Sequence, residues 1–267
     1  MVLEETLVRN NVTVTGSGDR TLLLAHGFGC DQTMWRFLTP HLRDRYRIVA
    51  FDYVGCGRSD PKAFSSSRYA DLDGYAQDII DVCDALELSD ITLVGHSVSA
   101  MTGLMAAISA PARIGKLVMV CPSPYFLNDP PDYFGGFERA DLEELIGLMD
   151  QNYIGWANQL APLVMGADGL SLVDELAHSF CSTDPVFAKA FARATFFSDC
   201  RGLLAKAKQP TLVLQSSNDS LAAVSVGQFV QARMQRARLE IVEASGHCLH
   251  MTHAEAIAPG IERFANP

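Results

Sequence analysis

Short apolar runs recur along the chain, and they constrain the fold more than any other feature. The runs are TLLLA at 21–25, RIVAF at 47–51, ITLVG at 91–95, KLVMV at 116–120 and TLVLQ at 211–215. A strand with one solvated face alternates polar and apolar residues, whereas a strand in a parallel sheet covered by helices on both faces is apolar throughout. The runs therefore predict a sheet with two buried faces.

Segments with helical periodicity separate these runs. Two further β-type runs lie at 7–14 and 239–242. We expect helices at 34–42, 69–86, 99–109, 224–234 and 254–264, where apolar residues recur every three or four positions. Strands that alternate with helices are typical of a doubly wound, mostly parallel sheet, so the predicted fold class is α/β.

The alternation stops between residues 121 and 210, where no convincing strand occurs. This segment begins with CPSPYFLNDPP and continues with apolar residues at helical spacing, such as Leu172, Leu176 and Phe180. A structureless loop of that length is implausible inside a compact domain, so we expect an inserted helical lid at 127–195. The core would then comprise 1–126 and 196–267.

Charge and composition exclude several classes of partner. The chain has 21 Lys and Arg against 31 Asp and Glu, and this net charge of −10 repels nucleic-acid phosphates and anionic membrane surfaces. No apolar run reaches the roughly 20 residues that span a bilayer. The N-terminal sequence lacks a secretory signal pattern, and the seven cysteines form no C-x-x-C pair. We therefore expect a cytoplasmic protein with reduced thiols that binds neither nucleic acid nor membrane.

The strongest chemical motif is a serine between a strand and a helix. In ITLVGHSVSA at 91–100, a β-type segment runs through Ser97 into a helical pattern, with Ser99 where the usual motif has Gly. A serine on such a turn is presented at the carboxyl edge of the sheet, beside helix N–H groups that can stabilise an oxyanion. We predict that Ser97 is a nucleophile; the alternative is that its hydroxyl only caps the helix.

A serine nucleophile needs a base, which lies on a later loop when the serine occupies such a turn. His247 follows the strand-like run LEIVE at 239–243 after a short loop, which is the position expected of the base. His250 and His253 fall at or after the start of the next helix, and we interpret them as partly exposed surface residues. Their H-x-x-H-x-x-H spacing lacks an acidic or thiol partner at matching spacing, so no metal site is predicted.

Asp219 is the predicted acid, because it follows the run at 211–215 at the same edge of the sheet. The rival loop after 116–120 offers no carboxylate before Asp129. Beside the imidazole, the Asp219 carboxylate would hold the productive tautomer. A surface-turn aspartate has the same local sequence and is the alternative.

The segment HGFG at 26–29 predicts the remaining part of an oxyanion site. Its glycines let backbone N–H groups turn toward a ligand, and we assign the N–H groups of Phe28 and Val98 as donors. His26 is interpreted as a residue that braces this loop by a hydrogen bond. The glycines at 52–60 lack the pattern of a phosphate-binding loop and predict a structural loop.

These residues together resemble the α/β-hydrolase superfamily. Within it, the chain is similar to the RsbQ-type bacterial stress-signalling hydrolases, the group that also holds plant strigolactone and karrikin receptors. The resemblance rests on GHSVSAM, SPYFLND, NYIGWA, FCSTDP, FFSDCR and GHCLHM, which are spread over essentially the whole chain. It implies an α/β-hydrolase fold with a four-helix lid over an apolar pocket, a triad of Ser97, Asp219 and His247, and oxyanion donors at Phe28 and Val98.

Five aromatic residues are candidate walls of that pocket: Phe126, Tyr153, Trp156, Phe196 and Phe197. For each, the alternative is packing within the lid. An aromatic pocket favours a small hydrophobic ester or lactone as the ligand.

Two functional hypotheses follow. The first is a serine hydrolase that cleaves an ester or lactone through an acyl-enzyme, with no cofactor. The second, which rests on the family likeness alone, is a ligand-sensing signalling module that engages a regulatory protein partner. A dehalogenase or epoxide hydrolase of the same fold needs Asp at the nucleophile position, and Ser97 opposes it.

Overall fold

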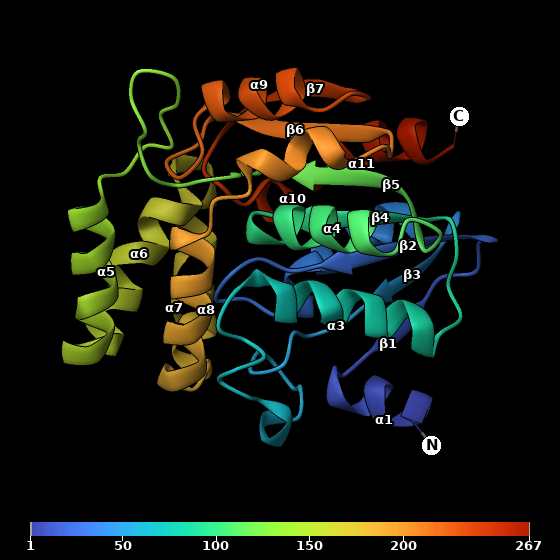
Figure 1. Ribbon diagram of the computed structural model, residues 1–267, viewed down its shortest axis with the longest axis horizontal. Helices are drawn as coiled ribbons and strands as arrows, with labels where there is room; N and C mark the ends of the chain where they lie inside the picture. The colour runs from blue at the N-terminus through green and yellow to red at the C-terminus, as the bar shows by residue number, and fades with distance from the viewer. Residues whose placement is uncertain (1, 267) are drawn as a thin grey trace.

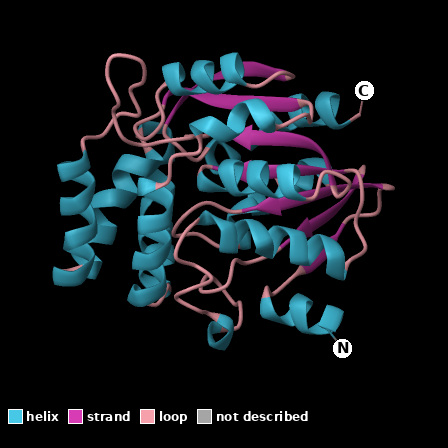
Figure 2. Ribbon diagram, in the orientation of Figure 1, coloured by secondary structure: helices cyan, strands magenta, loops and turns pink. Residues whose placement is uncertain are grey.

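A seven-stranded sheet forms the centre of the computed structural model, which describes residues 2–266 (Figures 1 and 2). The strands are β1 (Thr13–Thr15), β2 (Arg20–Ala25), β3 (Tyr46–Ala50), β4 (Ile91–His96), β5 (Ile114–Val120), β6 (Thr211–Asn218) and β7 (Ala237–Ser245). Their order is β1-β3-β2-β4-β5-β6-β7, and only β1 pairs antiparallel with its neighbour. The predicted mostly parallel sheet is confirmed.

Both faces of the sheet are buried, as the continuous apolar runs predict. In β2, Leu22 and Leu24 pack into one core cluster, whereas Leu23 and Ala25 pack into the other. Successive side chains of a strand point to opposite faces, so every residue of such a run contributes to one of two cores.

The helices cover both faces of this sheet. They are α1 (Val2–Arg9), α2 (Thr39–Leu42), α3 (Leu72–Ala85), α4 (Val98–Ser109), α5 (Arg139–Gln151), α6 (Tyr153–Met165), α7 (Val173–Ser182), α8 (Pro185–Phe197), α9 (Val224–Arg233), α10 (Leu249–Thr252) and α11 (Ala254–Ala265). Short 3-10 helices are η1 (Gln32–Phe37), η2 (Pro61–Ala63), η3 (Ala167–Leu172) and η4 (Arg201–Lys206). Helices α3, α4 and α9 pack on one face, and α2 and α11 pack on the other. Within residues 2–266, no helix has both the length and the apolar character to cross a membrane.

Helices α5–α8 form a group of their own beside the carboxyl ends of the strands (Figure 1). Their inward residues, among them Leu142, Trp156 and Leu160, join the same core cluster as Leu22 and Leu24 of β2. This group therefore lies over the sheet edge where loops after parallel strands meet.

Two predicted elements are wrong. The segment 7–14, predicted as a strand, is divided between helix α1 and the three-residue strand β1. Acidic residues in the first turn of α1 and Arg9 in its last turn suit a helix dipole. The segment 34–42, predicted as one helix, is divided into η1 and α2, with Pro40 in the first turn of α2.

Gly95 permits the close approach of β4 to α4. A Cβ at this position would lie 2.3 Å from the carbonyl oxygen of Ser99 on the following helix. Only a residue without a side chain fits between that strand and the first turn of the helix.

Replacing Gly95 with alanine should therefore lower the free energy of unfolding by about 1–3 kcal/mol, the usual range for overpacking a core. Gly147 is the matched control, because a Cβ in this interior position of α5 meets no atom within 4 Å. Gly147→Ala should raise the free energy by about 0.5–1 kcal/mol, through the lower conformational freedom of alanine. Urea unfolding measures both, and an unchanged stability for Gly95→Ala would contradict the close approach.

Candidate active site

Ser97 lies on a strained turn between β4 and α4. Its backbone has φ 56° and ψ −122°, a left-handed conformation that side-chain-bearing residues rarely adopt. Although Ser97 precedes the first residue of α4, its hydroxyl makes no capping hydrogen bond. The capping alternative is therefore excluded, and the hydroxyl is available for chemistry.

A hydrogen-bond chain joins Ser97, His247 and Asp219. Ser97 Oγ lies 2.8 Å from His247 Nε2, and His247 Nδ1 lies 2.8 Å from Asp219 Oδ2. Asp219 follows β6 and His247 follows β7, so neighbouring parallel strands present both at the edge where β4 presents Ser97. Donation from Nδ1–H to the carboxylate leaves Nε2 free to accept the serine proton.

The Asp219 carboxylate is held by several donors. Its Oδ1 accepts from the backbone N–H groups of Leu221 (2.9 Å) and Ala222 (3.1 Å), and its Oδ2 accepts from Gln215 Nε2 (3.2 Å). Burial raises the pKa of the Asp219 carboxyl. The charge of His247, the hydrogen bond with it and the two backbone hydrogen bonds outweigh this effect and leave the pKa below its ordinary value. Asp219 is thus an anion that orients the imidazole.

Two backbone amides at this edge remain free to bind an oxyanion. In the described part of the chain, the N–H groups of Phe28 and Val98 donate to no protein acceptor. Val98 is the first residue of α4, where N–H groups lack intrahelical partners. These are the two donors that the sequence predicts, one from the loop after β2 and one from the helix after Ser97.

Ser99, in the position where the usual motif has Gly, ties the turn to the loop of Phe28. Its hydroxyl donates to the carbonyl of His26 and lies 2.8 Å from the Tyr53 hydroxyl. His26 itself accepts from the Tyr53 N–H at 3.2 Å and bonds the Gly27 carbonyl at 2.9 Å. His26 therefore has the bracing contacts that its interpretation requires, and Ser99 and Tyr53 extend this support.

His250 corrects a prediction, because it is fully buried rather than partly exposed. Its ring packs 4.6 Å from Trp35 and 4.3 Å from His96, and within residues 2–266 its two nitrogens have no hydrogen-bond partner. The four-residue helix α10 turns this side chain inward onto the core. His253 is half-buried and contacts Asp168, in keeping with a partly exposed residue.

His96 supports the backbone of His247. Its Nε2–H donates to the carbonyl oxygen of His247 at 3.0 Å, and a Cβ on Gly27 would lie 2.4 Å from its Nδ1. The ring thus fills the space between the loop of Phe28 and the loop of His247. Burial, together with the nearby His247, lowers the pKa of His96 to about 3, so its ring is neutral. Sequence reasoning missed this role, because local sequence does not show which loop the ring contacts.

A small cavity with a free volume of about 30 Å³ lies above Ser97. Its wall includes Phe28, Phe126, Phe180, Phe196, Leu160, Val164, Leu176, Leu221, Thr195, Cys30 and Cys248, with the catalytic-edge residues His96, Ser97 and His247. Most of this wall is apolar. Leu160, Leu176 and Phe180 belong to the apolar residues at helical spacing in the segment 127–195. That spacing is the sequence feature that could have identified them as wall residues.

Two of the five candidate pocket aromatics line this cavity, Phe126 and Phe196. The other three lie outside its wall. Tyr153 stacks on Trp156, its hydroxyl donates to the Phe180 carbonyl at 2.8 Å, and Trp156 packs behind Phe28. Phe197 packs against the guanidinium groups of Arg139 and Arg193. These three residues match the alternative of packing within the lid.

Cys121 is a buried neighbour of Asp219. Its sulfur and ligand atoms of Asp219 and His247 lie within 4.8 Å of one another. Burial, and then the charge of Asp219, raises the pKa of the thiol well above its ordinary value. A metal would need the thiolate, and Nδ1 of His247 is already bonded to Asp219, so this donor set favours the hydrogen-bond chain over a metal centre.

A family model described as the alpha/beta hydrolase family matches residues 22–259. The chain belongs to the α/β-hydrolase family. The sheet order, the turn at Ser97 and the helical group over the sheet edge are thus features of a hydrolase fold in this chain.

Relatives cover nearly the whole of this α/β hydrolase. It is 38% identical over 95% of its length to a petunia karrikin insensitive 2 receptor, with 94% of that protein covered. It is 37% identical to the strigolactone esterase D14 of Arabidopsis thaliana, with 95% of each chain covered. A solved hydrolase from Oleispira antarctica superposes with a TM-score of 0.97 at 53% identity and covers 99% of this chain, with 98% of its own chain covered.

The buried His250 predicts a pH dependence of stability. An unfolded histidine takes up its proton near pH 6.5, whereas burial and the neighbouring His96 and His247 hold the folded pKa of His250 well below that value. The unfolded state therefore binds more protons below about pH 6.5, and the free energy of unfolding falls as the pH falls.

His250→Phe should reduce this slope by about 1 kcal/mol per pH unit between pH 6 and 5, because one proton is no longer taken up on unfolding. Urea unfolding at three pH values measures it. Trp35→Phe, at the ring that packs on His250, is the control and should shift stability equally at each pH. An unchanged slope for His250→Phe would mean that His250 is charged in the folded protein.

Proposed function

We propose that this protein is a serine hydrolase that cleaves a small hydrophobic ester or lactone. The observation that carries the proposal is the continuous hydrogen-bond chain from Ser97 Oγ through His247 to Asp219. Such a chain converts a weakly nucleophilic hydroxyl into a reactive one, because the imidazole accepts the proton as the bond to carbon forms.

In the first half of the proposed reaction, Ser97 Oγ attacks the ester carbonyl and His247 Nε2 takes the hydroxyl proton. The carbonyl oxygen becomes an oxyanion bound by the N–H groups of Phe28 and Val98. His247 then gives its proton to the alcohol oxygen, the bond between that oxygen and the acyl carbon breaks, and an acyl-enzyme remains.

In the second half, His247 takes a proton from water, and the resulting nucleophile attacks the acyl carbon. The proton returns to Ser97 Oγ as the carboxylic acid leaves. Asp219 stays ionised and stabilises the imidazolium in both halves. A lactone follows the same course, with the alcohol and the acid released as one molecule. No cofactor enters either half.

The cavity supports the choice of substrate. Its phenylalanine and leucine side chains favour an apolar acyl or alcohol group over a peptide or a charged metabolite. The Arabidopsis relative carries the name strigolactone esterase, which supports ester cleavage as the proposed reaction.

Hydrolysis of ethyl acetate, followed by titration of the released acid, tests the proposal. Ser97→Ala and His247→Ala should each lower kcat by at least about a thousandfold, as expected for loss of a triad member. His253→Ala, which removes the neighbouring histidine on the same segment, should leave kcat within a factor of two. Equal losses for His247→Ala and His253→Ala would show that the wrong base has been assigned.

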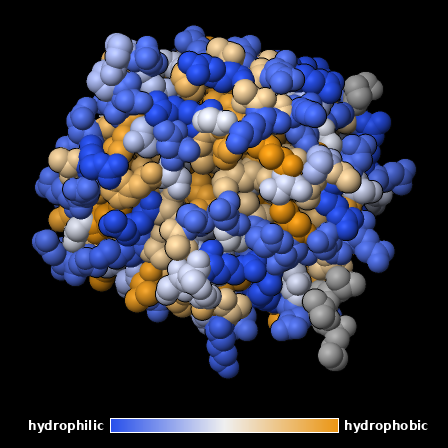
Figure 3. Space-filling model, viewed as in Figure 1, coloured by the Kyte–Doolittle hydropathy of each residue, from blue (hydrophilic) through white to orange (hydrophobic). Residues whose placement is uncertain are grey.

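A second function is favoured by apolar surface on the lid. Among residues 2–266, five of the eight exposed large apolar side chains lie in the segment 127–195: Phe134, Ile154, Leu163, Leu170 and Val186. In Figure 3, apolar surface appears on the side where Figure 1 places α5–α8, as well as over the middle of the molecule. The petunia relative carries the name of a receptor. A ligand-sensing module whose lid engages a regulatory protein partner fits these observations.

This second function requires the lid to respond when Ser97 is modified. Hydrogen exchange of the protein before and after reaction with a fluorophosphonate measures the response. The sensing function predicts altered exchange in α5–α8 and unchanged exchange in α3 and α9, with Ser97→Ala in the same reagent as the control. Unchanged lid exchange together with rapid multiple turnover would leave hydrolysis as the function.

A further inference from the structure

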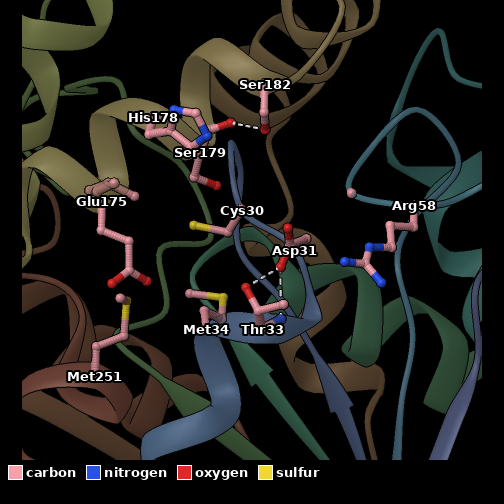
Figure 4. Close-up of a pocket in the computed structure, with 12 residues that line it drawn as sticks. Cys30, Asp31, Thr33, Met34, Arg58, Glu175, His178, Ser179, Ser182 and Met251 are labelled. Atoms are coloured by element: carbon pink, nitrogen blue, oxygen red, sulfur yellow. Dashed lines mark hydrogen bonds between the residues drawn. The ribbon is translucent and has the colours of Figure 1, made fainter.

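A second hollow lies outside the catalytic cavity. This outer groove has a volume of about 300 Å³ and runs between α7 and the loops that follow β2 and β3 (Figure 4). Its floor is made of the buried side chains of Cys30, Met34, Leu176 and Met251. Its rim is polar and consists of Asp31, Thr33, Gly57, Arg58, Glu175, His178, Ser179 and Ser182.

The outer groove and the catalytic cavity share a wall. Cys30 and Leu176 line both of them. Helix α7, which carries Leu176, is fixed next to the loop of Phe28, because the Ser179 hydroxyl donates to the Gly29 carbonyl at 2.8 Å. Movement of the two shared side chains would therefore connect the spaces without displacing the helix.

The catalytic cavity is too small to hold an extended substrate. Its volume of about 30 Å³ is room for two or three water molecules, at roughly 10–15 Å³ each. Apart from the groups at the catalytic edge and the Thr195 hydroxyl, its wall offers little to a polar substituent. Any further oxygen atoms of a substrate would lose their hydration there without gaining partners.

The rim of the outer groove offers hydrogen-bond donors that the protein does not use. In the described chain, the guanidinium of Arg58 and the ring of His178 make no hydrogen bond or ion pair. Figure 4 shows the Arg58 guanidinium directed across the groove toward Asp31, with His178 on the opposite rim.

The two carboxylates of the rim are already engaged. Glu175 accepts from Arg36 at 2.6 Å, and Asp31 accepts from the backbone N–H of Thr33 at 2.7 Å. Arg36 lies next to the rim and pairs with Glu175, so together with this neighbour the rim has two arginines against its two carboxylates, Asp31 and Glu175. It suits a neutral molecule with an apolar skeleton and acceptor oxygens.

We propose that the outer groove is a second subsite of the catalytic centre, and that it binds the alcohol part of an extended ester whose alcohol carries ether or carbonyl oxygens. The inference rests on the proposed hydrolysis at Ser97. A small acyl group occupies the catalytic cavity, the chain of the alcohol passes between Cys30 and Leu176, and its oxygens accept from Arg58 and His178. The alcohol leaves first in the reaction, so it is the part that needs a path to solvent.

Two acetates of equal chain length test this inference: 2-(2-methoxyethoxy)ethyl acetate, which has two ether oxygens, and heptyl acetate, which has none. Ethyl acetate serves as the short reference ester. The quantity measured is the ratio of the KM for the ether acetate to the KM for heptyl acetate. We expect Arg58→Met and His178→Phe each to raise this ratio about fivefold. Ser182→Trp, which fills the outer groove, should raise the KM of both long acetates relative to ethyl acetate. Arg236→Met, at an exposed arginine before β7, is the control and should leave every ratio unchanged.

Failure of this inference differs from failure of the proposed function. If wild type hydrolyses ethyl acetate but Arg58→Met and His178→Phe leave the ratios unchanged, the outer subsite is wrong and the hydrolase stands. If wild type hydrolyses none of the esters, the hydrolase proposal fails. The subsite is then tested by calorimetric binding of the two long acetates to Ser97→Ala. The subsite is supported if the ether acetate binds more tightly than heptyl acetate and if Arg58→Met weakens this binding. Equal binding of the two acetates overturns it.

Discussion

The parallel alignment of β4, β6 and β7 is the constraint on which the rest of the site depends. Each strand ends at the same edge of the sheet. Ser97 directly follows β4, Asp219 directly follows β6, and His247 lies two residues after β7. The three groups are far apart in the sequence, yet 2.8 Å contacts join them. A shift of one residue in the register of β6 or β7 would turn these side chains away from one another.

Two hydrogen bonds from residues near Ser97 support this arrangement. His96 bonds the carbonyl of His247, and Ser99 bonds the carbonyl of His26, so the turn at Ser97 is connected to the loops on both of its sides. Both supports come from residues within two positions of Ser97. The strained backbone of Ser97 is thus kept in place by contacts that also position His247 and the loop of Phe28.

Sequence patterns predict best those parts of the structure that depend on neighbouring residues in the chain. The apolar runs predict β2 to β6. The ends of the runs at 91–95 and 211–215 led to Ser97 and Asp219, and the end of the β-type run at 239–242 led to His247; the structure brings these three residues together. The prediction for 7–14 is wrong because a three-residue strand next to a short helix contains too few residues to show a helical or strand periodicity. The burial of His250, the thiol of Cys121 beside Asp219 and the orientation of Phe197 all depend on contacts between distant segments, which local sequence does not record.

The proposed chemistry depends above all on Ser97 acting as a nucleophile that His247 activates. The most direct measurement is the intact mass of the protein after reaction with a fluorophosphonate, followed by peptide mapping of the adduct. We predict one adduct per chain, located on Ser97, absent in Ser97→Ala and formed much more slowly in His247→Ala. A folded wild-type protein that forms no adduct, or that carries it on another residue, would contradict this role of Ser97.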